Sequence, residues 1–306
     1  MFFKCLKSLP ILIGAYTLTS HSYINLRDAY NNFYRIPINL QKTYNDQGYF
    51  LITGASDNLG KAFSRELAVK GIPLILISKH EDSLQKLKSE LEKEFSSKIE
   101  IITFDFERAS IESYESLFAQ INQFEISGLI NNTGSFLTQD FEKTTFEDLI
   151  KTIKSNILPN VFFSKYALER FKKKPPSSKS LISTISSALG AYPHPHISIF
   201  SASQAWNSNL MRSLIMEKPT NVDLNLIEPG LYSNQGLLHD FPSEWKESFR
   251  WKWLISETDE VAEEIVRRLG QEKVISGTFR HWVYHCILRN CEKMVNYLNE
   301  GTFLNL

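Results

Sequence analysis

The stretch Tyr49–Gly60, with the sequence YFLITGASDNLG, decides the fold. Its first five residues are an apolar run that stops at Gly54, which is the pattern of a buried strand ending in a turn. Apolar residues then recur at helical spacing from Leu59 to Val69. A turn of small residues at the start of a helix lets backbone N–H groups and the positive end of the helix dipole approach a phosphate. The stretch therefore predicts a strand, a turn and a helix, with an anion site at the turn.

The same alternation of strand and helix patterns continues along the chain. The expected strands are residues 49–53, 73–78, 99–104, 127–131, 181–186 and 222–227, and the expected helices are 59–69, 81–95, 111–124, 145–171, 202–217 and 258–269. Pro159 should kink or divide the fourth of these helices. The alternation predicts a Rossmann-type doubly wound parallel sheet in three α/β/α layers. Ligands of such sheets bind at the carboxyl ends of the strands, near the point where strand order reverses.

The composition is that of an ordinary globular protein. The chain has 306 residues, of which 42% are hydrophobic and 22% are charged. Its formal net charge is +0, so no overall field attracts nucleic acid. Three cysteines, an odd and sparse set, argue against a disulfide framework and for a reducing compartment. We expect a Rossmann-type domain over residues 48–270, with an N-terminal apolar segment and linker (1–47) and an amphipathic C-terminal tail (271–306).

The N-terminal region is the compositional anomaly. Residues 9–18 (LPILIGAYTL) form a short apolar run behind Lys4 and Lys7, and no acidic residue precedes Asp28. The run is shorter than the roughly 20 residues that span a bilayer comfortably. We favour a signal anchor or an interfacial segment, and hence association with a membrane. A basic mitochondrial presequence and an apolar arm packed on the domain are the alternatives.

The C-terminal region combines an amphipathic helical pattern with ligand-type side chains. An apolar face flanked by basic residues suits an interfacial membrane helix, a cover over a substrate cleft or a homodimer contact. Two histidines and two cysteines in this region lack zinc-finger spacing, so we expect no metal site. These four are His281, His285, Cys286 and Cys291, and the apolar face is Phe279, Trp282, Val283, Cys286, Ile287, Cys291, Met294, Val295 and Leu298.

Further motifs follow the later strands in a characteristic order. They are Asp105, Asn131-Asn132-Thr133-Gly134, Ser155-Asn156-Ile157 in the long helix, and Pro229-Gly230. In order and spacing, residues 49–238 resemble the short-chain dehydrogenase/reductase family. The turn after the first strand matches that family's Thr-Gly-x-x-x-Gly-x-Gly loop, with Asn58 in place of the middle glycine. Asparagine tolerates the left-handed conformation, but its side chain would crowd a bound dinucleotide and weaken its binding.

The resemblance implies a nicotinamide cofactor and the residues that hold it. In that family the loop approaches the pyrophosphate, an aspartate after the third strand touches the adenine, and the Pro-Gly pair covers the nicotinamide. A basic residue after the second strand suits the 2′-phosphate of NADP, so Lys79 favours NADP(H). The matched residues are Gly54, Ser56, Asp57, Asn58, Leu59, Gly60, Lys79, Asp105, Asn131, Gly134, Pro229 and Gly230.

Two segments point to a subfamily. Residues 193–200 (PHPHISIF) and Ile77-Ser78-Lys79 are similar to segments of very-long-chain 3-oxoacyl-CoA reductases and their hydroxysteroid dehydrogenase-like relatives. This resemblance implies a fatty acyl-CoA or steroid-like substrate and the endoplasmic reticulum membrane, with the mitochondrion as the alternative. In the family, the region that here contains four large side chains lines an acyl or steroid pocket, and a core or lid role is the other interpretation. The four are Trp245, Arg250, Trp251 and Trp253.

The catalytic positions are only half retained. In the family a serine polarises the carbonyl, a tyrosine donates the proton, a lysine lowers the tyrosine pKa, and an asparagine positions a relay water. By resemblance Ser187 and Asn156 keep the serine and asparagine roles. Phe200 stands at the tyrosine position and Gln204 at the lysine position. A positioned acid contributes about 10²–10⁴-fold to the rate, so efficient hydride transfer by the usual route is not expected.

Three functions stay open. The first is a catalytically impaired or inactive family member that still binds NADP(H). The second is an active NADPH-dependent 3-oxoacyl-CoA or ketosteroid reductase in which water, His194 or His196 supplies the proton; these histidines and Tyr192 also fit a surface loop. The third is a structural subunit of a membrane assembly.

Overall fold

In the computed structural model the described residues are 16, 19–20, 22–31, 34–44, 48–233 and 253–290. The chain forms two compact units, residues 1–36 and 37–306. In the first unit residues 22–31 are helical, and of the apolar run at 9–18 only Tyr16 lies within the described residues. Among the described helices, none has both the length and the apolar character needed to cross a membrane. The domain limits expected from the sequence stay a prediction.

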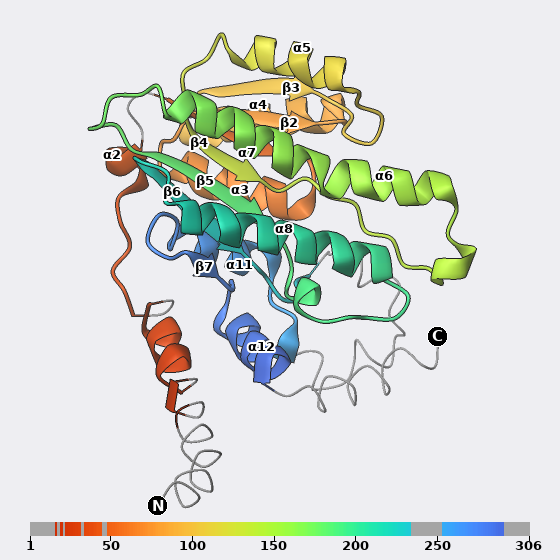
Figure 1. Ribbon diagram of the computed structural model, residues 1–306. Helices are drawn as coiled ribbons and strands as arrows, with labels where there is room; N and C mark the ends of the chain where they lie inside the picture. The colour runs from red at the N-terminus through yellow and green to blue at the C-terminus, as the bar shows by residue number, and fades with distance from the viewer. Residues whose placement is uncertain are drawn as a thin grey trace, which may run out of the picture. The chain divides into compact units, whose positions relative to one another are not determined.

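The second unit is built on a seven-stranded parallel sheet (Figure 1). The strand order is β3-β2-β1-β4-β5-β6-β7, so the order reverses between β1 and β4. Strands β1, β2 and β4 are buried throughout, which explains why they read as continuous apolar runs. The strands are β1 Tyr49–Thr53, β2 Leu74–Ser78, β3 Ile99–Thr103, β4 Ile126–Asn131, β5 Ser180–Ile185, β6 Val222–Ile227 and β7 Val274–Ile275.

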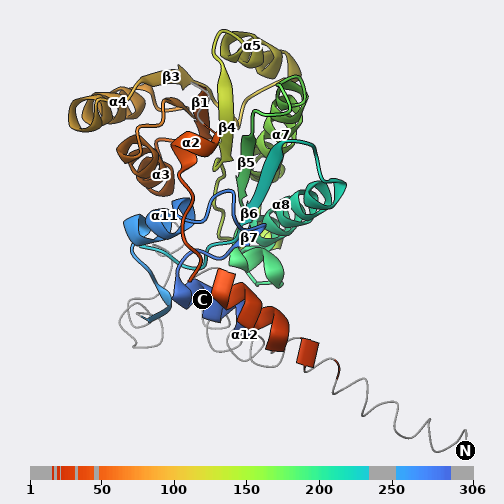
Figure 2. The same cartoon turned by 90° about the vertical axis from the view of Figure 1, so that its left-hand side faces the viewer.

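Helices cover both faces of this sheet, with α3, α4 and α11 on one face and α5, α7 and α8 on the other (Figure 2). One buried cluster, which includes Leu67 and Ile265, lies on the first face; a second, which includes Leu117 and Phe163, lies on the other. The three-layer Rossmann-type fold expected from the sequence is confirmed. The helices are α2 Leu40–Tyr44, α3 Asn58–Val69, α4 Glu81–Phe95, α5 Ile111–Ile121, η1 Phe141–Lys143, α6 Phe146–Asn156, α7 Leu158–Phe171, η2 Ala188–Ala191, α8 Ser198–Glu217, α11 Thr258–Val266 and α12 Phe279–Asn290.

The structure differs from the expected boundaries in three places. Pro159 divides the expected long helix, because α6 ends at Asn156 and the proline lies in the first turn of α7, where a missing N–H is tolerated. Helix α8 begins earlier than expected, at Ser198, so Phe200 lies in its first turn. Strand β7 was not expected, since Val274–Ile275 is too short to show a periodicity.

Candidate functional site

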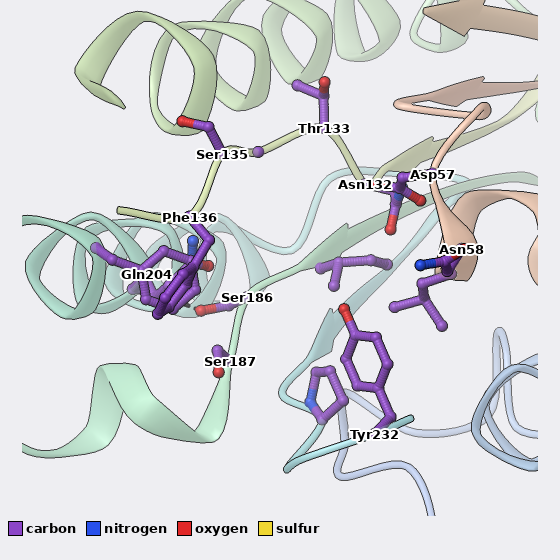
Figure 3. Close-up of a pocket in the computed structure, with 15 residues that line it drawn as sticks. Asp57, Asn58, Asn132, Thr133, Ser135, Phe136, Ser186, Ser187, Gln204 and Tyr232 are labelled. Atoms are coloured by element: carbon purple, nitrogen blue, oxygen red, sulfur yellow. Dashed lines mark hydrogen bonds between the residues drawn. The ribbon is translucent and has the colours of Figure 1, made fainter. Parts of the chain in front are cut away.

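Two adjoining cavities lie at the carboxyl ends of the strands. Cavity A, of about 420 Å³, is lined by residues that follow β1, β2, β3 and β4. Cavity B, of about 270 Å³, is lined by residues that follow β1, β4, β5 and β6 (Figure 3). The two cavities meet at the β1/β4 switch point, where doubly wound sheets bind their ligands. They share Asp57, Asn58, Thr133, Gly134 and Ser135.

The turn after β1 is tied closely to the turn after β4. Thr53 Oγ1 accepts hydrogen bonds from the backbone N–H groups of Asn132 (3.0 Å) and Thr133 (3.1 Å). Gly54 has a φ of +65°, and a Cβ at this position would lie 2.9 Å from Thr133 Cα. A Cβ on Gly60 would overlap the Gly54 carbonyl oxygen. Only glycine therefore allows the two turns to approach this closely.

Asp57 caps helix α3 where the two cavities meet. Its Oδ1 accepts a hydrogen bond from the Gly60 N–H at 2.6 Å, and Asn132 Nδ2 donates to both carboxylate oxygens at 3.2 Å. The helix dipole stabilises a carboxylate in this place. The cap also takes up one backbone donor that a phosphate could otherwise use. Asn58, which is exposed, lies beside it and lines both cavities.

Cavity A contains the residues expected to contact the adenosine end of a cofactor. Lys79 and Asp105 both line it, together with Glu107. Lys79 Nζ forms an ion pair with Glu107 Oε1 at 2.9 Å, and the Glu107 N–H donates to Asp105 Oδ1 at 3.0 Å. A cation beside a cavity of this kind suits a phosphate on the adenosine ribose. Glu107, which was not singled out from the sequence, competes for the same cation.

Three residues expected to bind the cofactor line neither cavity. The Asn131 side chain is buried and donates to Ser164 Oγ (3.2 Å) and Thr184 Oγ1 (3.3 Å), so it joins β4 to α7 and β5. Gly60 shapes the turn after β1. Gly230 packs against a histidine of α12, to which a Cβ at this position would approach within 2.7 Å. These residues shape the cleft without facing it.

Phe200 forms an apolar wall of cavity B. Its side chain is only 7% exposed and packs edge-to-face on Phe136, with ring centroids 4.6 Å apart. The same small cluster contains Leu189, Ile197 and Leu231. The aromatic ring is thus fixed in the first turn of α8 by packing on neighbouring elements. The wall of cavity B at this position is therefore a hydrocarbon surface.

Ser187 and Gln204 line the same cavity as Phe200. Ser187 Oγ accepts a hydrogen bond from the Leu189 N–H at 3.2 Å, so the serine caps the short helix η2 while its O–H proton stays available as a donor. Gln204 is buried, and its backbone carbonyl accepts a hydrogen bond from Ser186 Oγ at 2.8 Å. The structure therefore brings together around one cavity Ser187, Phe200 and Gln204, the three residues that the resemblance assigns to the serine, tyrosine and lysine positions.

Asn156 lies behind this wall and is fully buried. Its Oδ1 accepts a hydrogen bond from the Ser135 N–H at 2.6 Å, and its Nδ2 donates to the Ser135 carbonyl and to Ser203 Oγ, both at 3.0 Å. Its backbone carbonyl accepts two amide hydrogen bonds, from Asn160 Nδ2 and from Asn207 Nδ2, each at 2.9 Å. The asparagine is retained as a rigid link between α6, α8 and the turn after β4.

The substitute proton donors considered from the sequence lie outside cavity B. Tyr192 and His194 line a separate hollow beside the start of α8. His196 has a φ of +60°, and its Nδ1 lies 2.6 Å from Asp140 Oδ1, which joins two loops. None of the three is among the residues around cavity B, where the ionisable side chains other than serine and threonine hydroxyls are Asp57 and Tyr232.

The comparisons with known proteins agree with this geometry. A family model for short chain dehydrogenases matches residues 49–240. The chain belongs to the short-chain dehydrogenase family. Among curated relatives, a very-long-chain 3-oxoacyl-CoA reductase of Candida glabrata is 32% identical over 231 residues, which cover 71% of this chain and 66% of the relative. The 17-beta-hydroxysteroid dehydrogenase type 3 of Rattus norvegicus is 34% identical over 170 residues, which cover 55% of this chain and 54% of the relative.

Solved short-chain dehydrogenases share the fold. A 7beta-hydroxysteroid dehydrogenase superimposes with a TM-score of 0.71 at 19% identity, covering 85% of this chain and 99% of the other. A Sphingobium yanoikuyae short-chain dehydrogenase in complex with NADPH superimposes with a TM-score of 0.65 at 21% identity, covering 83% and 94%. The chain spans less than two thirds of the length of the first two curated reductases that it matches, 66% of one and 57% of the other.

The C-terminal helix α12 contacts the loop that follows β6. In α12, His281 and His285 are buried, and their Nε2 atoms lie 2.7 Å from the carbonyl oxygens of Leu231 and Glu228. The helix thus holds both sides of the Pro229-Gly230 pair. No group of side chains able to hold a metal ion occurs in the described part of the chain. Phe279, placed on the apolar face by its sequence spacing, is 54% exposed.

Besides Glu107 in cavity A, several residues of cavity B were missed by sequence reasoning. Ser135, Phe136 and Ser186 follow β4 and β5 directly, and the rule that ligands bind after strand ends could have found them. Tyr232 follows the Pro-Gly pair and projects into cavity B (Figure 3). No short motif includes it, since its importance comes from the packing around it. Of the large residues upstream of α11, the structure describes only Trp253, which is 39% exposed.

Proposed function

We propose that this chain is a short-chain dehydrogenase that binds NADP(H) but has lost efficient proton transfer to a ketone substrate. The observation that supports the proposal is the wall of cavity B, where Phe200, which the resemblance assigns to the proton donor's position, is packed against Phe136. Reduction of a ketone by hydride transfer requires a proton on the oxygen. A hydrocarbon ring cannot provide one, and the missing acid corresponds to about 10²–10⁴-fold in rate.

Of the two ionisable groups around cavity B, Tyr232 is a poor source of this proton, and Asp57, whose pKa is raised by burial to about 6, is bound to the Gly60 N–H and to Asn132 at the start of α3. Burial, and then the negative charge of Asp57, raise the pKa of Tyr232 well above its ordinary value. A phenol with a raised pKa is a weak acid near neutral pH, and no lysine lies beside it among the described residues of the cavity. The relay water expected beside Asn156 would also lack a place at the backbone carbonyl of this residue. The side-chain amides of Asn160 and Asn207 use both lone pairs of the carbonyl oxygen.

Binding of NADP(H) is supported by cavity A. The close glycine turn after β1, the N-terminus of α3 and Lys79 all border this cavity, which is the arrangement that holds an adenosine ribose bearing a 2′-phosphate. When bound, the cofactor would supply a hydride. The chain's own contribution would be to orient it with Lys79 and Asp105 at one end and with Ser187 and Pro229 at the other.

The relatives suggest the class of ligand that Ser187 would face. Their names include very-long-chain 3-oxoacyl-CoA reductase and a 17-beta-hydroxysteroid dehydrogenase, so we propose an acyl-CoA or steroid-like molecule with a carbonyl group. Association with the endoplasmic reticulum membrane through the N-terminal apolar segment, with the mitochondrion as the alternative, and a homodimer belong to the same proposal. Extraction of membranes with carbonate tests the first of these, because release of the chain into the supernatant contradicts an anchor.

An active reductase is the second candidate, because Ser187 and the Pro229 cover are both present around cavity B. Single-turnover oxidation of bound NADPH with a 3-oxoacyl-CoA and with a ketosteroid separates the two candidates. For an impaired protein we expect NADPH to bind while the wild-type rate equals that of Ser187→Ala. A wild-type rate well above that of Ser187→Ala, on either substrate, contradicts the proposal. Absence of NADPH binding would instead favour a purely structural role.

A further inference from the structure

Tyr232 lies inside cavity B, where the established parts of the site leave it without a role. It follows the Pro-Gly pair after β6, and its ring projects into the cavity with the hydroxyl group on the side of Asp57 (Figure 3). The effect of the Asp57 charge on Tyr232 agrees with this direction. Within the described part of the chain, no residue forms a hydrogen bond with the hydroxyl group. The side chain thus extends from the end of the cleft at Pro229, where the nicotinamide would lie, toward the start of α3, where the phosphates would lie.

The backbone that carries Tyr232 is held on both sides. The Ser233 N–H donates to the Ser256 carbonyl at 2.8 Å, and the Ser256 N–H donates to the Leu231 carbonyl at 3.1 Å. His281 Nε2 lies 2.7 Å from the same Leu231 carbonyl. The ring itself packs on the buried cluster of the α3 and α11 face. Because the backbone is fixed, only a rotation of the side chain could move the ring out of the cavity, and this rotation would remove its packing.

The two cavities differ in the room that they leave for a ligand. Pockets that enclose a drug-sized molecule have volumes of about 300–1,000 Å³. Cavity A, at about 420 Å³, falls in this range, and cavity B, at about 270 Å³, falls below it. Phe200 and Tyr232 both contribute aromatic rings to the walls of cavity B. Asn58, in place of a glycine, adds a side chain where the two cavities meet.

We infer that Tyr232 obstructs the nicotinamide end of the cleft, so that the site holds its ligand through an adenosine nucleotide bearing a phosphate beside Lys79. This inference rests on the proposed NADP(H) site and specifies which half of it is functional. The source of the adenosine is either NADP(H) itself or a free adenosine bisphosphate. Binding to cavity A requires no movement of Tyr232. Entry of the nicotinamide half requires the ring to rotate away from its packed position.

Calorimetric titration of the full chain with NADPH and with adenosine 2′,5′-bisphosphate tests the inference. For the wild type we expect the two dissociation constants to agree within about threefold, because the nicotinamide half adds little. In Tyr232→Ala we expect NADPH to bind at least about tenfold more tightly, with the bisphosphate unchanged. Tyr232→Leu keeps apolar packing but removes the aromatic ring that extends into the cavity. It replaces Tyr232→Ala if the alanine variant fails to fold. Tyr232→Phe keeps the ring and should behave as the wild type.

The contrary outcomes separate this inference from the proposed function. If the wild type binds NADPH about thirtyfold or more tightly than the bisphosphate, or if Tyr232→Ala weakens NADPH binding, then Tyr232 is a contact of the cofactor and the inference is wrong, while the proposed function stands. If neither ligand binds to the wild type or to the Tyr232 variants, the NADP(H) site itself is wrong. If the wild type binds the bisphosphate but binds NADPH only after Tyr232→Ala, the ring excludes the cofactor altogether, and the part of the inference that names NADP(H) as a ligand of the wild type is wrong.

Discussion

The side-chain amide of Asn207 donates a hydrogen bond to the backbone carbonyl of Asn156, with the two atoms 2.9 Å apart. Asn207 and Gln204 both lie on α8 and both are buried. With Asn160 as the second donor, the carbonyl has no lone pair left for a water molecule. The relay implied by the family resemblance would need such a water, so we propose that Asn207, one turn beyond Gln204 on the same helix, also hinders proton transfer.

Placing a tyrosine at position 200 and a lysine at position 204 should raise activity only in part, because an acid is then present but the Tyr232 ring must still rotate to admit the nicotinamide half. In Phe200→Tyr/Gln204→Lys we expect a gain of about 10²-fold in the single-turnover rate of NADPH oxidation with a 3-oxoacyl-CoA, because a positioned acid returns. Addition of Asn207→Ala frees the Asn156 carbonyl and should add about tenfold more. The rates are compared at saturating NADPH, so that differences in cofactor affinity do not enter.

Two controls define this result. Ser187→Ala in the triple variant should return the rate to the wild-type level, since the carbonyl oxygen then loses its donor. An equal rate in the double and triple variants would show that the Asn156 carbonyl has no part in the relay. If NADPH binds and no variant gains activity, then loss of the acid is not the reason for the low rate.

The ion pair between Lys79 and Glu107 should set the preference between the two nicotinamide cofactors. Because Glu107 competes with a 2′-phosphate for the Lys79 ammonium group, Glu107→Gln should tighten NADPH binding by about two- to fivefold. Lys79→Gln should weaken NADPH binding and leave NADH binding unchanged. Calorimetric titration of both variants measures these shifts. Equal effects on NADH and NADPH would mean that the pair does not face the 2′-phosphate.

Most of the fold could be predicted because its signals are local. The apolar runs of β1 and β6 have the bounds that the sequence indicates, and so does the charged helix α4. Pro159 marks a division that the helical spacing alone conceals. Strand β7 could not be found in this way, since two residues carry no period and pair with β6 only after the sheet has formed.

The site was predicted where it consists of motifs and missed where it depends on packing. The turn after β1 and Ser187 stand next to their strands, so their place in the cleft follows from the topology. The places of Tyr232 and Glu107 in the site depend on their contacts with residues distant in sequence, which no local motif reveals. In α12 the spacing places Phe279 on an apolar face, which does not indicate that His281 packs inward, because that packing depends on backbone carbonyl groups of the distant loop after β6.

Glycines near the turn after β1 and in the turn after β4 should tolerate substitution unequally. A Cβ on Gly60 would overlap the Gly54 carbonyl, which is backbone and cannot move aside, so Gly60→Ala should lower the free energy of unfolding by about 1–3 kcal/mol. A Cβ on Gly134 would lie 3.4 Å from Asn156 Oδ1, an ordinary contact. Gly134→Ala is thus the matched control and should change stability by much less. Urea unfolding of both variants measures the difference, and equal losses would show that the turn is looser than described.

His281 should make the stability of the protein depend on pH. Burial, the largest effect, lowers the pKa of this histidine to about 4, against about 6.5 in the unfolded chain. Between these values the unfolded chain binds a proton that the folded protein does not, so stability falls as the pH decreases from 6.5 to 4 and is unaffected by this group above that range. The expected loss approaches about 3 kcal/mol, since one pKa unit corresponds to about 1.4 kcal/mol.

The measurement is urea unfolding at several pH values between 7 and 4, for the wild type and for His281→Gln. Glutamine can still donate a hydrogen bond to the Leu231 carbonyl but does not titrate, so the variant should lose less stability than the wild type as the pH falls. His80→Gln, which removes an exposed histidine at the start of α4, is the control and should follow the wild-type curve. Parallel curves for His281→Gln and the wild type would mean that His281 has the same pKa in the folded protein as in the unfolded chain, and that burial in α12 does not keep it neutral.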